Sequence, residues 1–288
     1  ADIIFTSGAT ESAALALAGR NILCSSVEHE AVTSWCSSTL STCPNGLVDP
    51  QEPERSALQV ANSETGIIQE YKKGIWLSDM TQAFGKVPLA FNWHGCHCAM
   101  ISAHKIGGPK GIGALIVKRG TDLAAQIKGG GQEMGRRSGT ENLLGIVGFG
   151  AAAQAAHKDL ENGEWDKISE FRMILENMIE EFSDVPILVG KDSKRLPNTM
   201  CLITPGWRGE TQVMQMDLEG IAVSAGSACS SGKVKPSDVL RAMGFSDEQA
   251  SCALRVSLGL ETTKDEVMRF ADTWTKKFEN NVKRKNNM

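Results

Sequence analysis

The sequence predicts an α/β fold in which helices cover a mostly parallel sheet, followed by a smaller α+β domain. Up to about residue 140, short β-rich runs alternate with helices or turns, which is typical of a parallel sheet. Polar side chains follow several of these runs, at the edge where open α/β sheets bind ligands. The strands are expected at residues 3–6, 22–27, 57–61, 75–78, 99–102 and 114–118. We therefore expect residues 1–142 to form a large domain, and residues 143–288 to form an interdomain helix and a small domain.

Helices dominate the second half of the sequence. A long alanine- and glycine-rich helix is expected from Asn142 to about Leu160. Residues 165–182 follow with apolar side chains at helical spacing, and we interpret this stripe as core rather than as a partner-binding surface. The remaining elements are strands at 199–203 and 221–224 and helices at 211–218, 237–243 and 264–282.

The composition argues against several classes of function. Of the 288 residues, 41% are hydrophobic, which is enough to bury the cores of two domains. The formal net charge of −4 gives no electrostatic reason to expect nucleic-acid binding. No apolar run approaches the ~20 residues of a membrane-spanning helix, and no basic leader precedes the first strand. The eight cysteines lack the spacing of a disulfide framework, so a reducing, cytosolic location is expected.

One compact cluster of soft ligands occurs in His94-Gly95-Cys96-His97-Cys98. So short a run seldom directs four side chains at one tetrahedral centre. Cys98 also begins the expected strand that leads to Ser102, which favours a place in the core. We therefore expect no metal site at this cluster.

Lys105 is the most informative residue of the chain. It follows the apolar run Cys98-Ala99-Met100-Ile101 and precedes a glycine-rich turn. Burial at a strand end disfavours an ammonium group, and a neutral lysine amine can form a Schiff base with a carbonyl cofactor. The alternative is a strand-end lysine whose amine reaches out to solvent.

A phosphate site is suggested by Ile3-Ile4-Phe5-Thr6-Ser7-Gly8-Ala9-Thr10, which leads into an alanine- and leucine-rich helix. Free N–H groups at a helix start bind phosphate well, and the hydroxyls of Ser7 and Thr10 could assist. Simple capping of the helix by one of these hydroxyls is the alternative.

Asp79 follows the apolar run Gly74-Ile75-Trp76-Leu77-Ser78 and should lie at the carboxyl end of a strand. A carboxylate in this position can keep a pyridine nitrogen protonated. Asp79 could equally cap the loop that follows, and nothing in the local sequence decides between the two roles.

A single thiol, Cys229, lies within Ser227-Ala228-Cys229-Ser230-Ser231-Gly232-Lys233. Cysteine is usually buried and inert. Small neighbours and a nearby lysine favour instead an exposed thiol that readily forms a thiolate. Such a thiol could act as a nucleophile that carries its product outward.

These segments together resemble the cysteine desulfurases of the NifS/IscS type, within the class-V aminotransferase group of fold-type-I pyridoxal-phosphate (PLP) enzymes. The matching stretches occur in the order typical of that family, along almost the whole chain. They are residues 5–12, 27–32, 62–66, 78–86, 102–113, 129–142, 224–232 and 254–259. The resemblance implies a large domain with a sheet of the seven-strand type and a small C-terminal domain that carries the cysteine segment.

The resemblance also implies a role for each site residue. Lys105 would form the Schiff base with PLP, and Cys229 would take the sulfur. The planar guanidinium of Arg255 would hold the substrate carboxylate. The other cofactor contacts would be Thr10, Ser102 and His104 at the phosphate, Thr140 at the phosphate of a partner subunit, Asp79 at the ring nitrogen, Gln82 at the ring hydroxyl and His29 on the ring face.

The implied activity is the removal of sulfur from L-cysteine, which gives L-alanine and a persulfide on Cys229. Lys105 would move the α-proton, and His29 could relay a proton because imidazole titrates near neutral pH. The implied partners are a second copy of the chain, in a homodimer, and a sulfur-acceptor protein such as an iron–sulfur scaffold or a thiolation enzyme.

The chain departs from the family pattern in several places. Family members begin several dozen residues before the strand that opens this sequence, and residues 45–62 and 69–73 are short. The family commonly reads Asn-Asn-Glu where this chain has Asn62-Ser63-Glu64. The asparagine that contacts the ring hydroxyl aligns with Ser63, and we assign that contact to neither Asn62 nor Ser63. Met134 stands where an arginine is usual. These differences indicate either a naturally reduced member or a shortened version of one.

Two other functions remain open at this point. One is a different class-V enzyme, such as a selenocysteine lyase or a small aminotransferase. The other is a catalytically weakened chain that keeps the fold as a scaffold for partners. The joint presence of Lys105, Asp79, His29, Arg255 and Cys229 favours the enzyme.

Overall fold

The computed structural model describes residues 1–226 and 236–286, with the backbone alone for 285 and 286. The chain divides into two compact units. The first contains residues 1–43, 47–63 and 68–162, and the second contains residues 44–46, 64–67 and 163–288. This division places the long helix after Asn142 with the first unit, whereas the sequence-based division at 142/143 grouped it with the C-terminal half. The assignment of functional domains stays a prediction.

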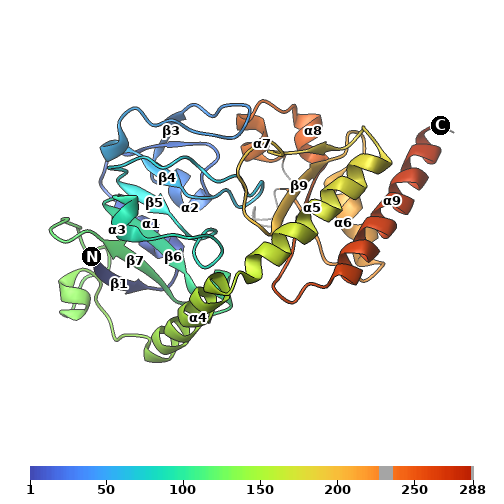
Figure 1. The fold of residues 1–288 in the computed structure, drawn as a ribbon. Coiled ribbons are helices and arrows are strands. Elements are labelled where there is room, and N and C mark those ends of the chain that lie inside the picture. The colour runs from blue at the N-terminus through green and yellow to red at the C-terminus, as the bar shows by residue number, and fades with distance from the viewer. Residues whose placement is uncertain (227–235, 287–288) are drawn as a thin grey trace. The chain divides into compact units, whose positions relative to one another are not determined.

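The first unit is built on a five-stranded sheet in the order β1-β7-β6-β5-β4 (Figure 1). Its strands are β1 (Asp2–Thr6), β4 (Ala57–Gln59), β5 (Leu77–Asp79), β6 (Cys98–Ser102) and β7 (Gly113–Val117). Strands β4, β5 and β6 run parallel, whereas β7 is antiparallel to both β6 and β1. The carboxyl ends of β1, β4, β5 and β6 therefore meet at one edge of the sheet.

Two further strands form a separate two-stranded sheet beside β4. They are β2 (Leu23–Ser25) and β3 (Ser37–Leu40), which pair in parallel. An isolated parallel bridge between Leu23 and Ser56 joins β2 to the edge next to β4. Within the five-stranded sheet only β7 runs against the others, which confirms the predicted mostly parallel sheet, whereas the predicted sheet of the seven-strand type is divided into this sheet and the two-stranded β2–β3 sheet.

The core of the first unit lies between this sheet and helix α1 (Ala9–Leu17), which packs against β6 and β7. Ile4, Leu77 and Leu115 are fully buried in it, together with Ala13 and Ala16 of the helix. Each large aliphatic side chain buried in this way contributes about 1.5–3 kcal/mol of transfer free energy. The apolar β-rich runs thus form the central strands, and the alanines allow α1 to lie close to the sheet.

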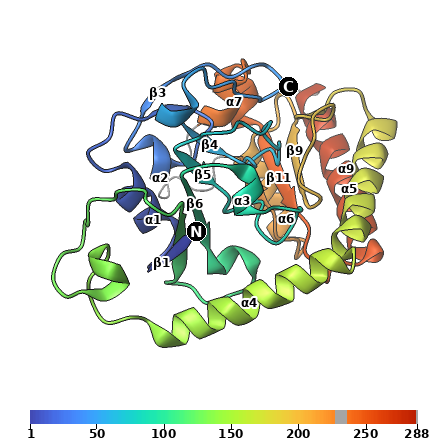
Figure 2. The ribbon, with the colours of Figure 1, turned by 60° about the vertical axis from the view of Figure 1, so that its left-hand side comes forward.

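Helix α4 (Leu143–Glu161) begins at Asn142, whose Oδ1 accepts the Gly145 N–H at 3.0 Å. The helix packs against the short 3-10 helix η2 (Ala103–Ile106). Figure 2 shows α4 along its full length. This approach requires small residues, because a Cβ on Gly148 would lie 2.5 Å from Pro109. The packing of α4 therefore fixes the turn that carries Lys105.

The second unit contains a four-stranded antiparallel sheet in the order β10-β11-β9-β8. Helices α5 (Glu164–Phe182), α6 (Gly209–Asp217) and α9 (Lys264–Asn286) belong to the same unit. Trp207 and Trp274 are fully buried in its core, where Trp274 stacks on Phe278 at 5.3 Å between ring centroids. The strands are β8 (Ile187–Leu188), β9 (Thr199–Ile203), β10 (Ser224–Ala225) and β11 (Ala253–Ser257).

A buried ion cluster links α5 to the segment that precedes β9. Glu176 accepts hydrogen bonds from Arg172 at 2.9 Å and from Arg195 at 2.7 Å. All three side chains are at most 10% exposed. Arg195 also pairs through its backbone with Ile67, so the cluster lies beside the N-terminal segment 64–67 of this unit.

Several short elements complete the chain. The predicted strand at 221–224 overlaps β10 only at Ser224, and β3, β8 and β11 were not predicted. The smaller helices are α2 (Glu30–Thr33), α3 (Phe91–His94), α7 (Asp238–Ala242), α8 (Asp247–Ser251), η1 (Pro53–Arg55) and η3 (Gln132–Gly135).

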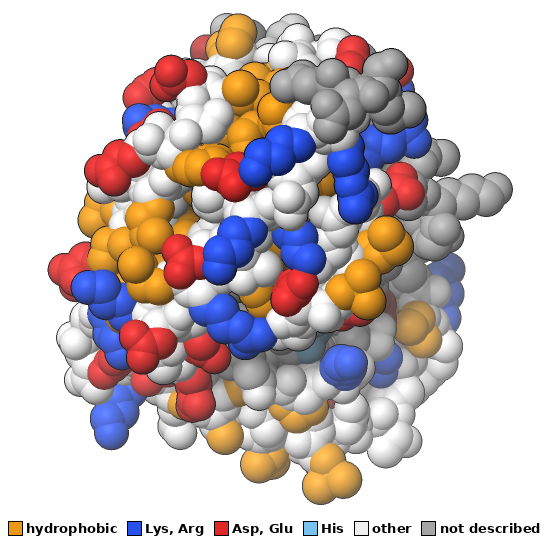
Figure 3. Space-filling model, turned by 90° about the vertical axis from the view of Figure 1, so that its right-hand side faces the viewer, with side chains coloured by type: hydrophobic (Ala, Val, Ile, Leu, Met, Phe, Trp, Pro, Cys, Tyr) orange, Lys and Arg blue, Asp and Glu red, His pale blue; other side chains and the backbone are white. Residues whose placement is uncertain are grey.

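Among the described residues, no helix is both long and apolar enough to cross a bilayer. On the face drawn in Figure 3, Lys and Arg side chains are interspersed with Asp and Glu, and hydrophobic side chains lie between them. That face therefore carries no large region of a single charge.

Candidate active site

The start of helix α1 forms one side of the candidate site. Gly8 caps the helix without any side-chain hydrogen bond, and the Ser7 N–H donates instead to Glu11 at 2.8 Å. Neither Ser7 nor Thr10 caps the helix, so the alternative weighed from the sequence is not what the structure contains. Thr10 is exposed in the first turn. The first N–H groups of α1 are thus oriented as an anion site requires.

Ser102 and His104 lie beside this helix start. A Cβ on Gly8 would be 3.8 Å from the Ser102 hydroxyl, which places the end of β6 next to α1. The Ser102 Oγ and the His104 Nδ1 are 2.9 Å apart. Burial lowers the pKa of His104, and the positive charges of Lys105 and Lys110 lower it further. A hydroxyl, an imidazole and a helix start therefore converge at one place.

Asp79 is buried at the carboxyl end of β5, with 8% of the residue exposed. Its Oδ1 accepts the Thr81 N–H at 2.8 Å, so it also stabilises the following turn. Burial raises the pKa of Asp79, while the hydrogen bonds from Thr81 and the positive charges of His29 and Lys105 lower it. The structure thus brings Asp79, His29 and Lys105 into one cluster, where a further cation would stabilise the carboxylate.

His29 precedes helix α2 and caps it. Its Nδ1 accepts the Ala31 N–H at 3.1 Å. The neutral ring therefore carries its proton on Nε2. The side chain is exposed at the same end of the sheet, so Nε2 can exchange protons with a bound molecule.

Lys105 is exposed, which differs from the burial that the sequence argument assumed. Strand β6 ends at Ser102, and the chain then turns through η2 to Gly107 at φ 80°. Lys105 therefore lies three residues beyond the strand, on a helical turn. Its charge still acts on Asp79, His104 and Lys86, which keeps it at the centre of the cluster.

Lys86 was not singled out from the sequence, although it lies in the matching stretch 78–86. It is only 9% exposed, and its Nζ donates to the backbone oxygen of Gln82 at 2.9 Å. Burial lowers the pKa of Lys86 to about 8, and the charge of Lys105 contributes. Lys86 therefore fixes the turn that carries the half-buried Gln82. In the sequence, only its place in Ala83-Phe84-Gly85-Lys86, directly after two apolar residues and a glycine, pointed to the burial of Lys86.

Glu28 is a second buried group that the sequence did not reveal. Its Oε1 accepts the Gln59 N–H at 2.8 Å, and within the described residues its Oε2 has no hydrogen-bond partner. Burial raises the pKa of Glu28 well above its usual range, and the nearby Asp79 carboxyl adds to the effect. Burial therefore favours the neutral form of Glu28, which directly precedes His29 in the chain.

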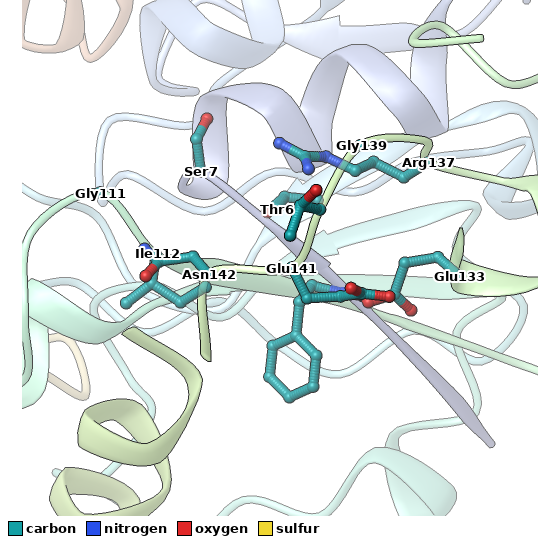
Figure 4. Close-up of a pocket in the computed structure, with 11 residues that line it drawn as sticks. Thr6, Ser7, Gly111, Ile112, Glu133, Arg137, Gly139, Glu141 and Asn142 are labelled. Carbon is teal, nitrogen blue, oxygen red and sulfur yellow. Dashed lines mark hydrogen bonds between the residues drawn. The ribbon is translucent and has the colours of Figure 1, made fainter. Parts of the chain in front are cut away.

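Thr140 is exposed in the loop that precedes α4. It lines a hollow of about 250 Å³ together with Ser7, Ile112 and Asn142. Figure 4 shows Arg137 extending towards the start of α1, where its Nε donates to Glu11 at 2.8 Å. The assignment of Thr140 to a partner's phosphate stays a prediction.

Two predicted site residues remain. Arg255 lies half-buried on β11 of the second unit, opposite Cys201 and Ser224. Cys229 falls in 227–235, outside the described residues. The roles of both residues stay predictions, as do those of the residues in the first unit.

The soft-ligand run at 94–98 contains thiols that stay protonated. Burial raises the pKa of both Cys96 and Cys98 to about 12. Among the described residues, no group of three or more His, Cys, Asp or Glu side chains is arranged to hold a metal ion.

Comparison with known families and structures decides the family. The profile of the class-V aminotransferases matches residues 52–270. The chain belongs to the class-V aminotransferase family. It is 37% identical to a cysteine desulfurase IscS of Dictyoglomus turgidum over 92% of the chain and 76% of that protein. It is 36% identical to a cysteine desulfurase of a Frankia species over 94% of the chain and 75% of that protein.

The fold of this class-V family member also matches a solved structure. The crystal structure of a NifS-like protein from Rickettsia africae superimposes with a TM-score of 0.87 at 29% identity, over 96% of the chain and 82% of that structure. The predicted resemblance to the NifS/IscS type and the α/β fold of fold-type-I enzymes are therefore confirmed. The roles of the individual site residues are tested by none of these comparisons.

Proposed function

We propose that the chain is a PLP-dependent cysteine desulfurase, which converts L-cysteine to L-alanine and leaves the sulfur as a persulfide on Cys229. The observation that carries the proposal is the cluster of Asp79, His29 and Lys105 at the sheet edge. The relatives named above, which are cysteine desulfurases, support the same reaction. The reaction balances, because the carbon–sulfur bond of cysteine and the S–H bond of Cys229 break while a sulfur–sulfur bond forms in the persulfide and a C–H bond forms at the methyl carbon of alanine.

The residues at the site fit PLP on three counts. The start of α1 with Thr10, Ser102 and His104 suits a phosphate. The buried carboxyl of Asp79 suits a protonated ring nitrogen. The exposed amine of Lys105 is free to bond an aldehyde. His29 and Gln82 would contact the ring, and PLP bound there would supply an electron sink for the substrate's α-carbon.

The protein's own groups would then divide the work. Lys105 would remove and return protons at the α-carbon, and His29 would move a proton through Nε2. Arg255 would bind the substrate carboxylate through its planar guanidinium. Cys229 would attack the sulfur as a thiolate, since the thiolate is the nucleophilic form.

We also propose that the working form is a homodimer in which Thr140 reaches the partner's phosphate site. Exposed apolar side chains near Thr140 support this assembly. Leu144 is 88% exposed, Met134 is 81% exposed and Val147 is 72% exposed. Sulfur would pass from Cys229 to an acceptor protein such as an iron–sulfur scaffold. The seven cysteines among the described residues are all free thiols, which supports a reducing, cytosolic setting.

The decisive experiment adds L-cysteine to the purified chain loaded with PLP, and records the absorbance of the lysine-bound cofactor together with alanine and sulfide. The intact chain should show the band, lose it on substrate addition and form alanine. Lys105→Ala should lack the band, and Cys229→Ser should keep it yet release no sulfide. A colourless chain that stays colourless with PLP contradicts the proposal, as does selenide release from selenocysteine without sulfide release from cysteine.

A further inference from the structure

The carboxyl group of Glu64 lies between the two ends of the segment 227–235. Ser237, which follows this segment, donates its hydroxyl proton to Glu64 Oε2 at 2.5 Å. Gly226, which precedes the segment, lies nearby, since a Cβ built on it would be 3.7 Å from the same oxygen. Glu64 therefore bonds the residue on one side of the segment that contains Cys229 and lies beside the residue on the other.

Each of these ends is itself fixed. Ser237 is fully buried, and its hydroxyl accepts the Leu240 N–H at 3.1 Å as the cap of α7. Gly226 is buried, and its N–H donates to Ala253 on β11 at 3.1 Å. A side chain on Gly226 would approach the Ala253 Cβ to 2.9 Å. Ser237 is thus held by α7 and Gly226 by β11, and the Glu64 carboxyl lies near both residues.

Glu64 is placed by the same unit. The segment 64–67 belongs to the second unit, where the Gly66 carbonyl accepts the Leu196 N–H at 2.8 Å. The adjoining backbone of Ile67 bridges to Arg195, which lies in the buried ion cluster. The carboxyl group is therefore fixed by the backbone on its own side as well as by Ser237.

The charged groups around Glu64 come from three elements. Arg255 on β11 lowers the pKa of Glu64, and Asp238 on α7 raises it. Burial raises the pKa of the Cys201 thiol on β9, and the charge of Glu64 raises it further. Burial is the largest effect and raises the pKa of Glu64 to about 7, while the Ser237 hydrogen bond opposes it. Ionised Glu64 accepts the Ser237 proton and attracts Arg255, whereas the neutral acid loses that attraction.

We propose that Glu64 is a positioning residue that fixes Ser237 and lies beside Gly226, on the two sides of the segment 227–235, and thereby sets the efficiency of sulfur transfer to Cys229. This inference rests on the proposed function for its readout. Sulfur transfer to Cys229 follows the binding of PLP, which depends on residues of the first unit. Substitution of Glu64 should therefore slow persulfide formation and leave PLP binding unchanged.

The test compares Glu64→Ala and Glu64→Gln with the intact chain loaded with PLP. Glu64→Ala should keep the cofactor band and its change on adding cysteine, while persulfide formation on Cys229 slows about ten-fold or more, because small misplacements of reacting groups are costly. Glu210→Gln, an exposed change on α6, should leave both steps unchanged. A Glu64→Ala chain that forms persulfide at the normal rate overturns the inference.

Glu64→Gln supplies a second, milder test, because the amide keeps the shape and can still accept from Ser237. Its rate should equal that of the intact chain well below pH 7, where Glu64 is neutral, and fall behind as the pH rises through about 7. A constant ratio of the two rates across this range contradicts the role. If the intact chain itself shows no band and forms no alanine, the proposed function fails instead, and the two failures are thereby distinguished.

Discussion

The backbone N–H of Thr81 donates a 2.8 Å hydrogen bond to the buried carboxyl of Asp79. This bond fixes the Oδ1 of Asp79 at the carboxyl end of β5. Because burial alone would favour the neutral acid, the ionised form depends on the cations around it. Asp79 is thus prepared for a positively charged partner.

Asp79→Asn tests whether the negative charge of Asp79 is needed for the reaction. The amide oxygen can still accept the Thr81 N–H, so the turn should persist, but the negative charge is lost. We expect activity to fall about 10²–10³-fold, the usual loss when one electrostatic group at a reaction centre is removed. The measurement is alanine formation at saturating PLP, with the exposed Asp122→Asn as the control. Near-normal activity in Asp79→Asn would falsify the assignment of the ring nitrogen to this residue.

His29→Asn separates the structural role of His29 from its chemistry. Asparagine is a good helix cap, so α2 should remain intact. The proton on Nε2 is lost, and we expect turnover to fall about 10²–10⁴-fold if this atom moves a proton in the reaction. Turnover and thermal unfolding are measured together, and His157→Asn on the exposed face of α4 serves as the control. Unchanged turnover would exclude His29 from proton transfer.

Glu28→Gln should reveal the buried acid through its pH dependence. The pKa of Glu28 is raised in the folded chain, while in the unfolded chain it is about 4.3. The native protein therefore loses stability as the pH rises above about 4.3, because only the unfolded state can ionise freely. Glutamine removes this loss and keeps the bond from Gln59.

Urea unfolding of the two proteins checks this expectation. The stability advantage of Glu28→Gln should be absent near the pKa of the unfolded acid and should grow as the pH rises towards neutrality. Glu30→Gln, an exposed change two residues away, should be neutral. An advantage that does not vary with pH would mean that Glu28 is ionised in the native protein.

Glu176→Ala should strongly destabilise the second unit. It leaves Arg172 and Arg195 buried without their shared carboxylate. Breaking a buried pair in this way costs about 3–5 kcal/mol. Glu180→Ala on the same helix removes only an exposed pair with Lys191 and should cost about 0–1 kcal/mol. Equal losses in the two variants, measured by denaturant unfolding, would show that the cluster adds no more than a surface pair.

Much of the fold could be predicted because its signals are local. Strand β9 coincides with the predicted residues 199–203, and α4 lies within one residue of the predicted helix. Strand β3 was missed because Ser37–Leu40 is polar and mostly exposed, so no apolar pattern marks it. The sequence could also place Asp79 and Ser102, since apolar runs lead directly to them.

The rest of the site depends on contacts that no local pattern encodes. Glu28 and Lys86 look like ordinary charged residues until the tertiary structure buries them. The exposure of Lys105 was missed although the strand end at Ser102 was predicted correctly, because no apolar pattern marks the turn of η2 that carries the lysine to the surface. The periodicity of a sequence indicates which side chains lie on the same face of a helix or strand. Whether one of these side chains is buried depends on contacts with segments that are distant in the sequence.

The second unit recruits the short segments 44–46 and 64–67, so the polypeptide passes between units at 43/44, 46/47, 63/64, 67/68 and 162/163. Ile67 is 1% exposed there and lies against Gly46 and Gly190. During synthesis on the ribosome, this isoleucine emerges long before Gly190 and Arg195, which lie against it. A C-terminal fragment beginning at 163 would consequently lack part of its own interior, so the second unit can complete its core only when the distant segments 44–46 and 64–67 are supplied by the same polypeptide.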